Sequence, residues 1–300
     1  MSNAGEGFTW ALGGGIVRQA AARTLAAPGG GEMPELPELE VYAENLRPRV
    51  AGKIVVSVET HHGGVLRRIA PEAFAVRVKG CRIKEIVRRG KTLGFVLDSG
   101  DRIDVHLMLQ GEMCCAMPGP VQQPPEPCLT LVFQDGARLI FSDPHYNVLN
   151  PREPKMWIGV NEKERVGLDP LGSTFTSEAL ATLCRAHKLL PLKALLTDQK
   201  LIGGLGNAYV DEILWTAGVR PRRVVSLMAP AEIEAVKEAI DRVLAEALSR
   251  TRQGLRGKIR GEIREHFQVH RRAGKPCPRC GTRIAEEYFR ERATHWCPTC

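Results

Sequence analysis

The sequence predicts an α+β protein of several domains: an N-terminal antiparallel β-sandwich with a leading helix, a helical domain, and a C-terminal metal-binding finger. Short β-type runs fill residues 53–142, and helical periodicity replaces them from about residue 171. Two Cys-x-x-Cys pairs then close the chain. A length of 300 residues agrees with more than one domain.

The leading helix is predicted from Glu38 onward. Apolar residues recur there at helical spacing until Gly52 ends the pattern: Leu39, Tyr42, Ala43, Leu46 and Val50. The preceding Met-Pro-Glu-Leu-Pro-Glu, residues 33–38, has a simple local explanation, because proline and glutamate are ordinary first-turn residues of helices.

The β-type runs follow the helix. They cover residues 53–60, 74–79, 82–87, 93–98, 102–107, 129–134 and 137–142. Asp135-Gly136 is a strong turn dipeptide, so the last two runs are predicted to form a hairpin. Residues 118–127 hold five prolines and are predicted to be an irregular loop. The pattern predicts antiparallel strands, most simply a sandwich.

Helices are predicted over residues 177–189, 192–198, 208–217 and 230–250. Between two of them lies the glycine-rich segment Lys-Leu-Ile-Gly-Gly-Leu-Gly-Asn, residues 200–207. By itself this segment fits a phosphate-binding loop and a plain helix–helix turn equally well. It is not a nucleotide-binding P-loop, because no Gly-Lys-Ser/Thr follows.

The charge is unevenly distributed. The chain has 42 basic and 34 acidic residues, a net charge of +8. Residues 250–300 contain 13 Lys and Arg but only 5 Asp and Glu, so this last sixth carries the entire excess. Such a bias indicates a polyanionic partner. No run of eighteen apolar residues exists, so a membrane partner is not expected.

Four of the nine cysteines have the spacing of a metal site, Cys277-x2-Cys280-x16-Cys297-x2-Cys300. Four thiolates suit one structural Zn²⁺ in a closed tetrahedral site. Two redox-active dithiols are the alternative, but no βαβ pattern surrounds them. The spacer carries Arg283, Arg290 and Arg292, which would present guanidinium groups to phosphates.

Taken together, the motifs resemble the formamidopyrimidine-DNA glycosylase/endonuclease VIII family of base-excision repair enzymes. They are Pro-Glu-Leu-Pro-Glu after Met33, Arg89-Gly-Lys91, His106-Leu, Gly203-Gly-Leu-Gly-Asn207-Ala-Tyr and the basic cysteine finger. The resemblance covers the chain from Met33 onward. It implies an N-terminal β-sandwich, a helix-two-turn-helix domain and a zinc-ribbon finger, with damaged double-stranded DNA bound between them.

The implied domains are a catalytic β-sandwich over residues 34–160, a linker over 161–170, a helix-two-turn-helix domain over 171–265 and a zinc finger over 266–300. The implied activity is that of a bifunctional DNA glycosylase and AP lyase, a hydrolase and lyase acting on oxidised bases. We expect a monomer with one structural zinc ion, in the cytoplasm or nucleoid of a bacterial-type cell.

The resemblance also assigns catalytic roles. Pro34 matches the family's N-terminal nucleophile, whose secondary amine attacks C1′ and forms a Schiff base that drives β,δ-elimination. Glu35 matches the general acid/base, Glu38 an acidic residue that supports the site, and Lys91 a lysine that contacts the flanking phosphate. Each of two residues also has an explanation without a catalytic role: Lys91 could be a solvated charge in a turn, and Glu38 could be a helix cap.

The implied DNA contacts are more widely spread. Asn207 and Arg292 match phosphate clamps, while Lys193 and Tyr209 are weaker matches. Leu109 stands where family members often carry a methionine wedge. On the second wedge loop His145 and Tyr146 replace the usual arginine and phenylalanine, and either could stack in the gap left by a flipped nucleotide.

The lesion preference stays open. The Pro-Glu-Leu-Pro-Glu motif favours oxidised purines. Residues 254–268 are shorter than the loop that caps such purines, which favours oxidised pyrimidines.

Residues 1–33 decide whether the chemistry is possible. They are rich in Ala and Gly, and we expect a leader or a start codon placed too far upstream, with an organellar presequence as the weaker alternative. While they stay attached, the Pro34 nitrogen is a tertiary amide without a usable lone pair. The chain could then bind damaged DNA but not cleave it.

Overall fold

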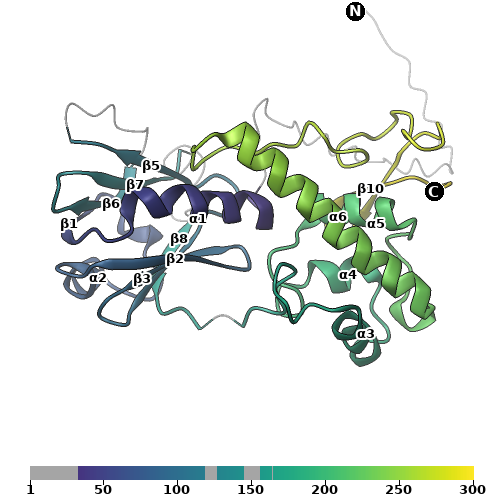
Figure 1. Ribbon diagram of the computed structural model, residues 1–300, viewed down its shortest axis with the longest axis horizontal. Coiled ribbons are helices and arrows are strands. Elements are labelled where there is room, and N and C mark those ends of the chain that lie inside the picture. The colour runs from purple at the N-terminus through teal and green to yellow at the C-terminus, as the bar shows by residue number, and fades with distance from the viewer. Residues whose placement is uncertain (1–32, 119–126, 145–155, 164) are drawn as a thin grey trace, which may run out of the picture. The chain divides into compact units, whose positions relative to one another are not determined.

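The computed structural model describes residues 33–118, 127–144, 156–163 and 165–300. The chain forms two antiparallel four-stranded sheets, a group of helices and a C-terminal hairpin (Figure 1). The predicted fold class is confirmed. Within these ranges no helix has both the length and the apolar character of a membrane span.

The N-terminal half is a sandwich. One sheet has the strand order β1-β6-β7-β5 and the other has the order β2-β3-β4-β8. The strands are β1 (Val55–Thr60), β2 (Ile83–Arg89), β3 (Thr92–Leu97), β4 (Arg102–His106), β5 (Glu112–Ala116), β6 (Pro127–Phe133), β7 (Arg138–Ser142) and β8 (Trp157–Val160). A short 3₁₀ helix, η1 (Gly63–Val65), follows β1. The predicted hairpin is present as β6 and β7, joined through Asp135 and Gly136.

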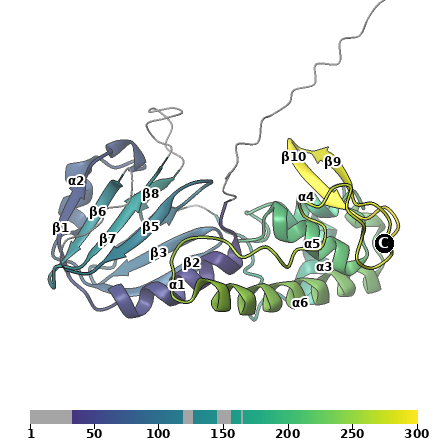
Figure 2. The same cartoon turned by 90° about the horizontal axis from the view of Figure 1, so that it is seen from above.

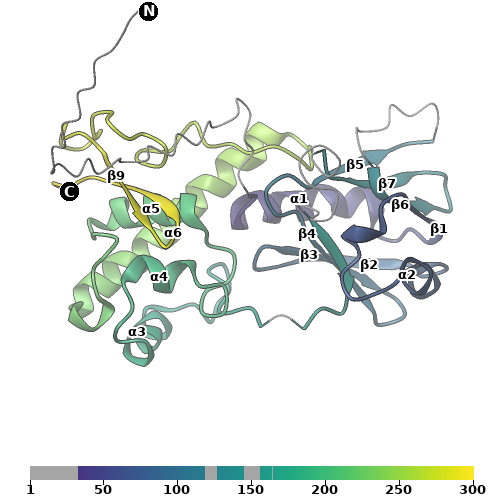
Figure 3. The same cartoon turned by 180° about the vertical axis from the view of Figure 1, so that it is seen from behind.

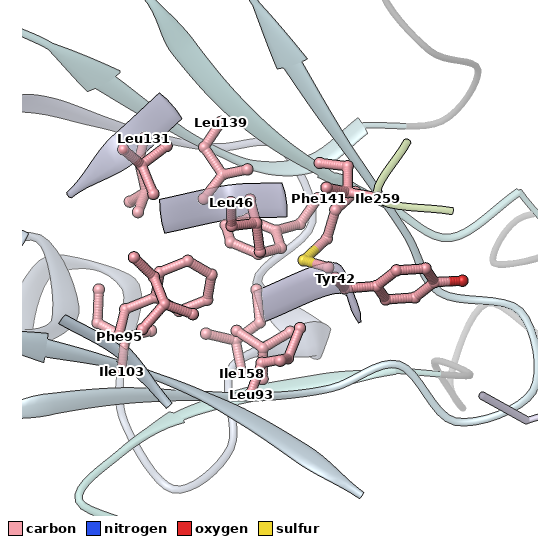
Figure 4. Packing of buried hydrophobic residues seen from close by; sticks show 14 of the residues in the cluster. Tyr42, Leu46, Leu93, Phe95, Ile103, Leu131, Leu139, Phe141, Ile158 and Ile259 are labelled. Atoms are coloured by element: carbon pink, nitrogen blue, oxygen red, sulfur yellow. The ribbon is translucent and has the colours of Figure 1, made fainter. Parts of the chain in front are cut away.

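Helix α1 (Leu36–Val50) packs into this sandwich. Figure 4 shows Tyr42 and Leu46 between the side chains of the two sheets. Across the core, the rings of Phe95 and Phe141 meet edge to face with centroids 6.2 Å apart. Burial of one apolar face therefore fixes the helix.

One predicted strand is wrong. Residues 74–79 belong to helix α2 (Pro71–Val78). The alternating apolar residues suggested a strand, but Val76 is 80% exposed, whereas Phe74 and Val78 are buried. These two are four residues apart and share one helical face, and Pro71 occupies the first turn.

Two strands of the sandwich were not predicted, β5 and β8. The β5 sequence Glu-Met-Cys-Cys-Ala has no β-branched residue and no clear alternation. It is a strand because it pairs with β7, and β8 is one because it pairs with β4. The proline-rich stretch predicted as a loop lies mostly outside the described residues.

The helical half contains α3 (Ser177–Ala186), α4 (Leu192–Thr197), α5 (Asn207–Ala217), the 3₁₀ helix η2 (Val225–Leu227) and α6 (Pro230–Leu255). The predicted helices are present, although α6 continues five residues beyond the prediction.

Helix α6 packs against α5 and also against α1 (Figure 2). Leu36, the first residue of α1, is buried in the helical core, whereas Leu39 and Tyr42 are buried in the sandwich core. The start of α1 therefore lies where the two cores meet.

The C-terminal hairpin consists of β9 (Ala285–Phe289) and β10 (Arg292–Trp296). Strand β10 packs against α5. Figure 3 shows the hairpin, in yellow, beside that helix. The hairpin therefore lies next to the glycine-rich loop that leads into α5.

Candidate active site and metal centre

The site is built at the start of α1. Glu35 caps the helix in an extended backbone conformation. Its N–H donates to Oε2 of Glu38 at 3.0 Å, which is half of a capping box. Oε1 of Glu38 accepts a 2.7 Å hydrogen bond from the hydroxyl of Tyr209. The local explanation of Glu38 as a cap is therefore correct, but its carboxylate also connects α1 to α5.

Glu38 is completely buried. Burial raises the pKa of its carboxyl to about 7, with a further increase from nearby Glu35, and the Tyr209 hydroxyl offsets part of this rise. The carboxyl of Glu38 can therefore gain or lose a proton close to neutral pH.

Glu35 is 4% exposed. Its Oε1 accepts a hydrogen bond from the N–H of Ala208 at 3.2 Å and lies 3.8 Å from the ammonium of Lys91. Within the described chain, its buried Oε2 has no hydrogen-bond partner. One carboxylate oxygen is thus held in place while the other is left for a ligand or a proton.

Lys91 lies in the turn between β2 and β3. Its side chain is only 9% exposed, so it is not a solvated turn charge. Burial lowers the pKa of its ammonium, Glu35 opposes this, and the positive charge of Arg292 lowers it further. Lys91, Glu35 and Arg292 are therefore electrostatically coupled.

The glycine-rich loop packs directly against these groups. A Cβ atom at Gly206 would collide with Nζ of Lys91 and Oε1 of Glu35. Gly204 has a φ of +96°, and its carbonyl accepts a 3.1 Å hydrogen bond from the N–H of Leu36. The loop thus brings the N-terminus of α5 to the start of α1.

Asn207 begins α5 beside the hairpin. Its side-chain nitrogen donates to the carbonyl of Ala293 at 2.8 Å, and its buried Oδ1 has no partner among the residues described. Arg292 is exposed on β10. Lys193, Asn207, Arg290 and Arg292 line one pocket beside the hairpin. The structure therefore brings both expected phosphate clamps to one place.

The two weaker candidates, Lys193 and Tyr209, are buried. Tyr209 is completely buried and its hydroxyl is bound to Glu38, so it has no surface to offer DNA. Lys193 is 2% exposed, and its ammonium is bound by Asp211 at 2.5 Å and Thr294 at 2.8 Å. Lys193 therefore joins α4, α5 and β10 from the inside, and only the edge of its side chain reaches the pocket.

The candidate wedge residues are only partly described. Leu109 lies between β4 and β5 and is 48% exposed, as a side chain that enters a DNA gap would be. His145 and Tyr146 lie outside the described residues.

Sequence reasoning missed Arg264 and Glu262, which follow α6. Nε of Arg264 is 3.8 Å from Oε1 of Glu38 and 3.5 Å from Oε2 of Glu262. Burial raises the pKa of Glu262 to about 8, and Glu38 and Glu35 add to the rise. No sequence motif marks these residues, because only the folding of their segment over the start of α1 brings them to the site.

The four cysteines of the finger converge. The Sγ atoms of Cys277 and Cys300 are 3.9 Å apart, and those of Cys280 and Cys297 are 3.5 Å apart. Tetrahedral zinc with ordinary Zn–S bonds needs sulfur atoms about 3.8 Å apart. Trp215 donates its indole N–H to Sγ of Cys277 at 3.3 Å. These four residues fit one structural zinc ion.

A second convergent group consists of Asp211, His270 and His295. Here the ammonium of Lys193 already occupies Oδ1 of Asp211, and both imidazoles lie within hydrogen-bond distance of Oδ2. This arrangement is a hydrogen-bond network in which a cation is already present.

Comparison with known proteins gives a consistent result. Three family models match in order: the formamidopyrimidine-DNA glycosylase N-terminal domain over residues 33–146, the formamidopyrimidine-DNA glycosylase H2TH domain over residues 166–258, and a zinc finger found in FPG and IleRS over residues 274–300. The formamidopyrimidine-DNA glycosylase of Chloroflexus aggregans is 36% identical over 274 residues, with 89% of this chain and 98% of the relative covered. That of Exiguobacterium sibiricum is 33% identical with the same coverage.

Solved structures agree. The Lactococcus lactis FPG (MutM) in complex with FAPY-dG DNA has a TM-score of 0.77 at 26% identity, with 89% of this chain and 99% of that chain covered. MutM bound to DNA with carbocyclic 8-oxo-G has a TM-score of 0.78 at the same identity and coverage. The matches in sequence and structure extend over the sandwich, the helices and the finger, and this chain belongs to the formamidopyrimidine-DNA glycosylase family of DNA repair enzymes.

Proposed function

We propose that this DNA glycosylase excises oxidised bases through a Schiff base on the nitrogen of Pro34 and then cleaves the DNA strand by β- and δ-elimination. The observation that carries the proposal is the arrangement at the start of α1. Glu35, with one oxygen held and the other available, is the residue next to Pro34 and faces Lys91. The resemblance assigns these same positions to the nucleophile, the acid/base and a phosphate contact.

The first step breaks the glycosidic bond. The lone pair of the Pro34 amine forms a bond to C1′, the glycosidic bond breaks, and the damaged base leaves with the electron pair of the glycosidic bond. The resulting ammonium passes its N–H proton to the departing base, which returns a lone pair to the nitrogen. Glu35 donates a proton to the sugar ring oxygen as the ring opens, and the nitrogen lone pair then completes the iminium. The available Oε2 of Glu35 is the atom that would carry this proton.

The iminium then acts as an electron sink. Loss of a proton from C2′ expels the 3′ phosphate, and a second elimination expels the 5′ phosphate. Lys91, Asn207 and Arg292 supply positive charge and hydrogen-bond donors for these phosphates. Asn207 and Arg292 line a common pocket, and Arg292 acts electrostatically on Lys91.

The proposal requires a free amine at Pro34, so residues 1–33 must be absent from the active form. The N-terminal family model matches from residue 33. The Chloroflexus aggregans relative is covered over 98% of its length by 89% of this chain. Both observations support Met33 as the initiator, with its removal exposing Pro34. If residues 1–33 are retained, the alternative is a protein that binds damaged DNA without cleaving it.

Borohydride trapping tests the proposal. A protein that starts at Pro34 should form a covalent adduct with abasic-site duplex under reduction, and the chain from residue 1 should form none. Glu35→Gln in the shorter form should bind DNA but trap far less. Absence of an adduct with the form that starts at Pro34 would refute the proposal.

The lesion class needs a separate assay. The similar structures hold FAPY-dG, carbocyclic 8-oxo-G and abasic DNA, which is a property of those proteins. Incision of matched duplexes that carry one oxidised purine or one oxidised pyrimidine would decide the preference of this chain.

A further inference from the structure

Arg264 contacts the residue that precedes Pro34. Its NH2 donates to the carbonyl oxygen of Met33 at 3.2 Å. The guanidinium also lies 6.0 Å from the centroid of the Tyr209 ring and 5.8 Å from that of Phe267. Its side chain is 13% exposed, so aromatic rings and the two carboxylates of Glu38 and Glu262 enclose it.

This position becomes important when Met33 is removed. The Met33 oxygen and the Pro34 nitrogen are bonded to the same carbonyl carbon and are therefore about 2.3 Å apart. NH2 of Arg264 thus lies within about 5.5 Å of the Pro34 nitrogen. Loss of Met33 leaves this guanidinium beside a newly formed secondary amine.

Without the Arg264 guanidinium, the Pro34 amine would lie among several acidic side chains. Charged and titratable groups surround the start of α1. They include Glu35, Glu38 and Tyr42 on α1, Lys91 in the β2–β3 turn, Lys193 on α4, Tyr209 on α5, Glu262, Arg264, His270 and Arg271 after α6, and Arg292 on β10. Three carboxylates favour the protonated amine, which has no lone pair to attack C1′. A nearby cation opposes the ionised carboxylates and increases the neutral fraction of the amine near neutral pH.

Hydrogen bonding to Arg264 also favours the neutral form of the Pro34 amine. A secondary ammonium has only N–H donors, and a guanidinium also has only donors, so the two repel each other. A neutral amine has a lone pair that can accept from Arg264 until the substrate replaces it. The guanidinium therefore favours the neutral form by both its charge and its donors.

We propose that the Arg264 guanidinium keeps the Pro34 nitrogen unprotonated and oriented for attack near neutral pH. The inference rests on the proposed function, since it presupposes a free amine at residue 34. Arg264 acts through Pro34 and is a positioning residue. Burial lowers the pKa of Arg264 to about 9, which leaves it charged at pH 7. Partial protonation of Glu38 and Glu262 near this pH limits their opposing effect.

The test uses protein that starts at Pro34 and measures the trapping rate on abasic-site duplex from pH 5 to 8.5. Arg264→Gln should move the acidic midpoint upward by about one unit or more, because one close cation is lost. Trapping at pH 7 should then fall about tenfold and recover as the pH rises. Arg264→Lys keeps the charge and should restore the midpoint. Arg260→Gln, an exposed position on the same segment, is the matched control.

A second measurement needs no DNA. Formaldehyde and cyanoborohydride methylate amines only in their unprotonated form, lysines included, and mass spectrometry of the N-terminal peptide gives the rate at the Pro34 nitrogen alone. Arg264→Gln should shift this pH profile as it shifts the trapping profile. Arg264→Met removes the same charge from a side chain of similar length, so it should shift the midpoint in the same direction and gives a test even if Arg264→Gln does not fold.

The outcomes separate the two proposals. If Arg264→Gln lowers trapping by the same factor at every pH, or if neither variant moves the methylation midpoint, the inference about Arg264 is wrong. If the unmodified form traps DNA at no pH, the proposed function fails instead, and the methylation profiles still report on Arg264.

Discussion

The hydroxyl of Tyr209 donates a 2.7 Å hydrogen bond to Oε1 of Glu38, although the two residues are 171 positions apart in the sequence. Both side chains are fully buried, one on α5 and the other on α1. The pair therefore connects the helical half to the sandwich at the point where the proposed chemistry takes place.

Removal of this hydroxyl should change the titration of Glu38. The hydrogen bond from Tyr209 lowers the pKa of Glu38, so Tyr209→Phe should raise that pKa above its value of about 7. Carboxyl-carbon NMR of labelled protein would measure it. The buried hydrogen bond should also contribute about 1 kcal/mol to the free energy of unfolding. Tyr288→Phe, at a side chain that is 70% exposed, should change neither quantity.

Glu38 should make stability depend on pH. Its pKa rises from 4.5 to about 7 on folding, so its stabilising contribution is complete below pH 4.5 and is lost as pH rises through 7. The loss should be about 3 kcal/mol, and Glu38→Gln should remove this part of the pH dependence. Denaturant unfolding at several pH values would measure it, with Glu238→Gln on the exposed face of α6 as the control. Identical pH dependence in Glu38→Gln and the parent protein would contradict the expectation.

Gly206 should tolerate no side chain. A methyl group there would displace the ammonium of Lys91 and the carboxylate of Glu35. Gly206→Ala should reduce the trapping rate about 100-fold, because small displacements of catalytic groups have effects of that size. Gly172→Ala adds a methyl group away from these residues, where the nearest atom would be 3.2 Å away. It should trap at the parental rate, and an equal loss in both variants would argue against the expected crowding.

Removal of zinc should unfold the finger. Its hydrophobic cluster contains only four buried residues, Val269, Cys277, Ile284 and Cys297, and two of these are metal ligands. Chelation should therefore lower DNA affinity and change the fluorescence of Trp215, whose indole contacts Cys277. Added zinc should restore both signals. The Cys81→Ser variant should retain the zinc ion, because Cys81 is not one of the four ligands, whereas the Cys277→Ser variant should lose it.

Arg292 should contribute affinity without selectivity. Because it is exposed on β10, Arg292→Ala should weaken binding to damaged and undamaged duplex by the same factor. The slope of log affinity against log salt should fall by about one. Arg185→Ala on α3 is the control. It also removes one positive charge, but from a residue that pairs with Glu178, and it should leave DNA affinity unchanged. An effect confined to one lesion would exclude a phosphate role.

Local patterns in the sequence were sufficient for much of the fold. Helical periodicity predicted α1 and the helices of the second half, and Asp135-Gly136 predicted the hairpin of β6 and β7. The cysteine spacing predicted a metal site, and the four sulfur atoms do converge. Each of these features depends on residues close together in the chain, so a local pattern is enough to predict it.

Tertiary structure decided the features that depend on distant residues. The alternating pattern at residues 74–79 became helix α2 because Phe74 and Val78 had a common core face to fill, and β5 became a strand because it pairs with β7. In the same way, Tyr209 and Lys193 proved to be buried links, and Arg264 reached the start of α1. The sequence alone determined which chemical groups the chain carries and where its regular elements form. Their burial, partners and protonation depended on packing between segments far apart in the chain, which no local pattern encodes.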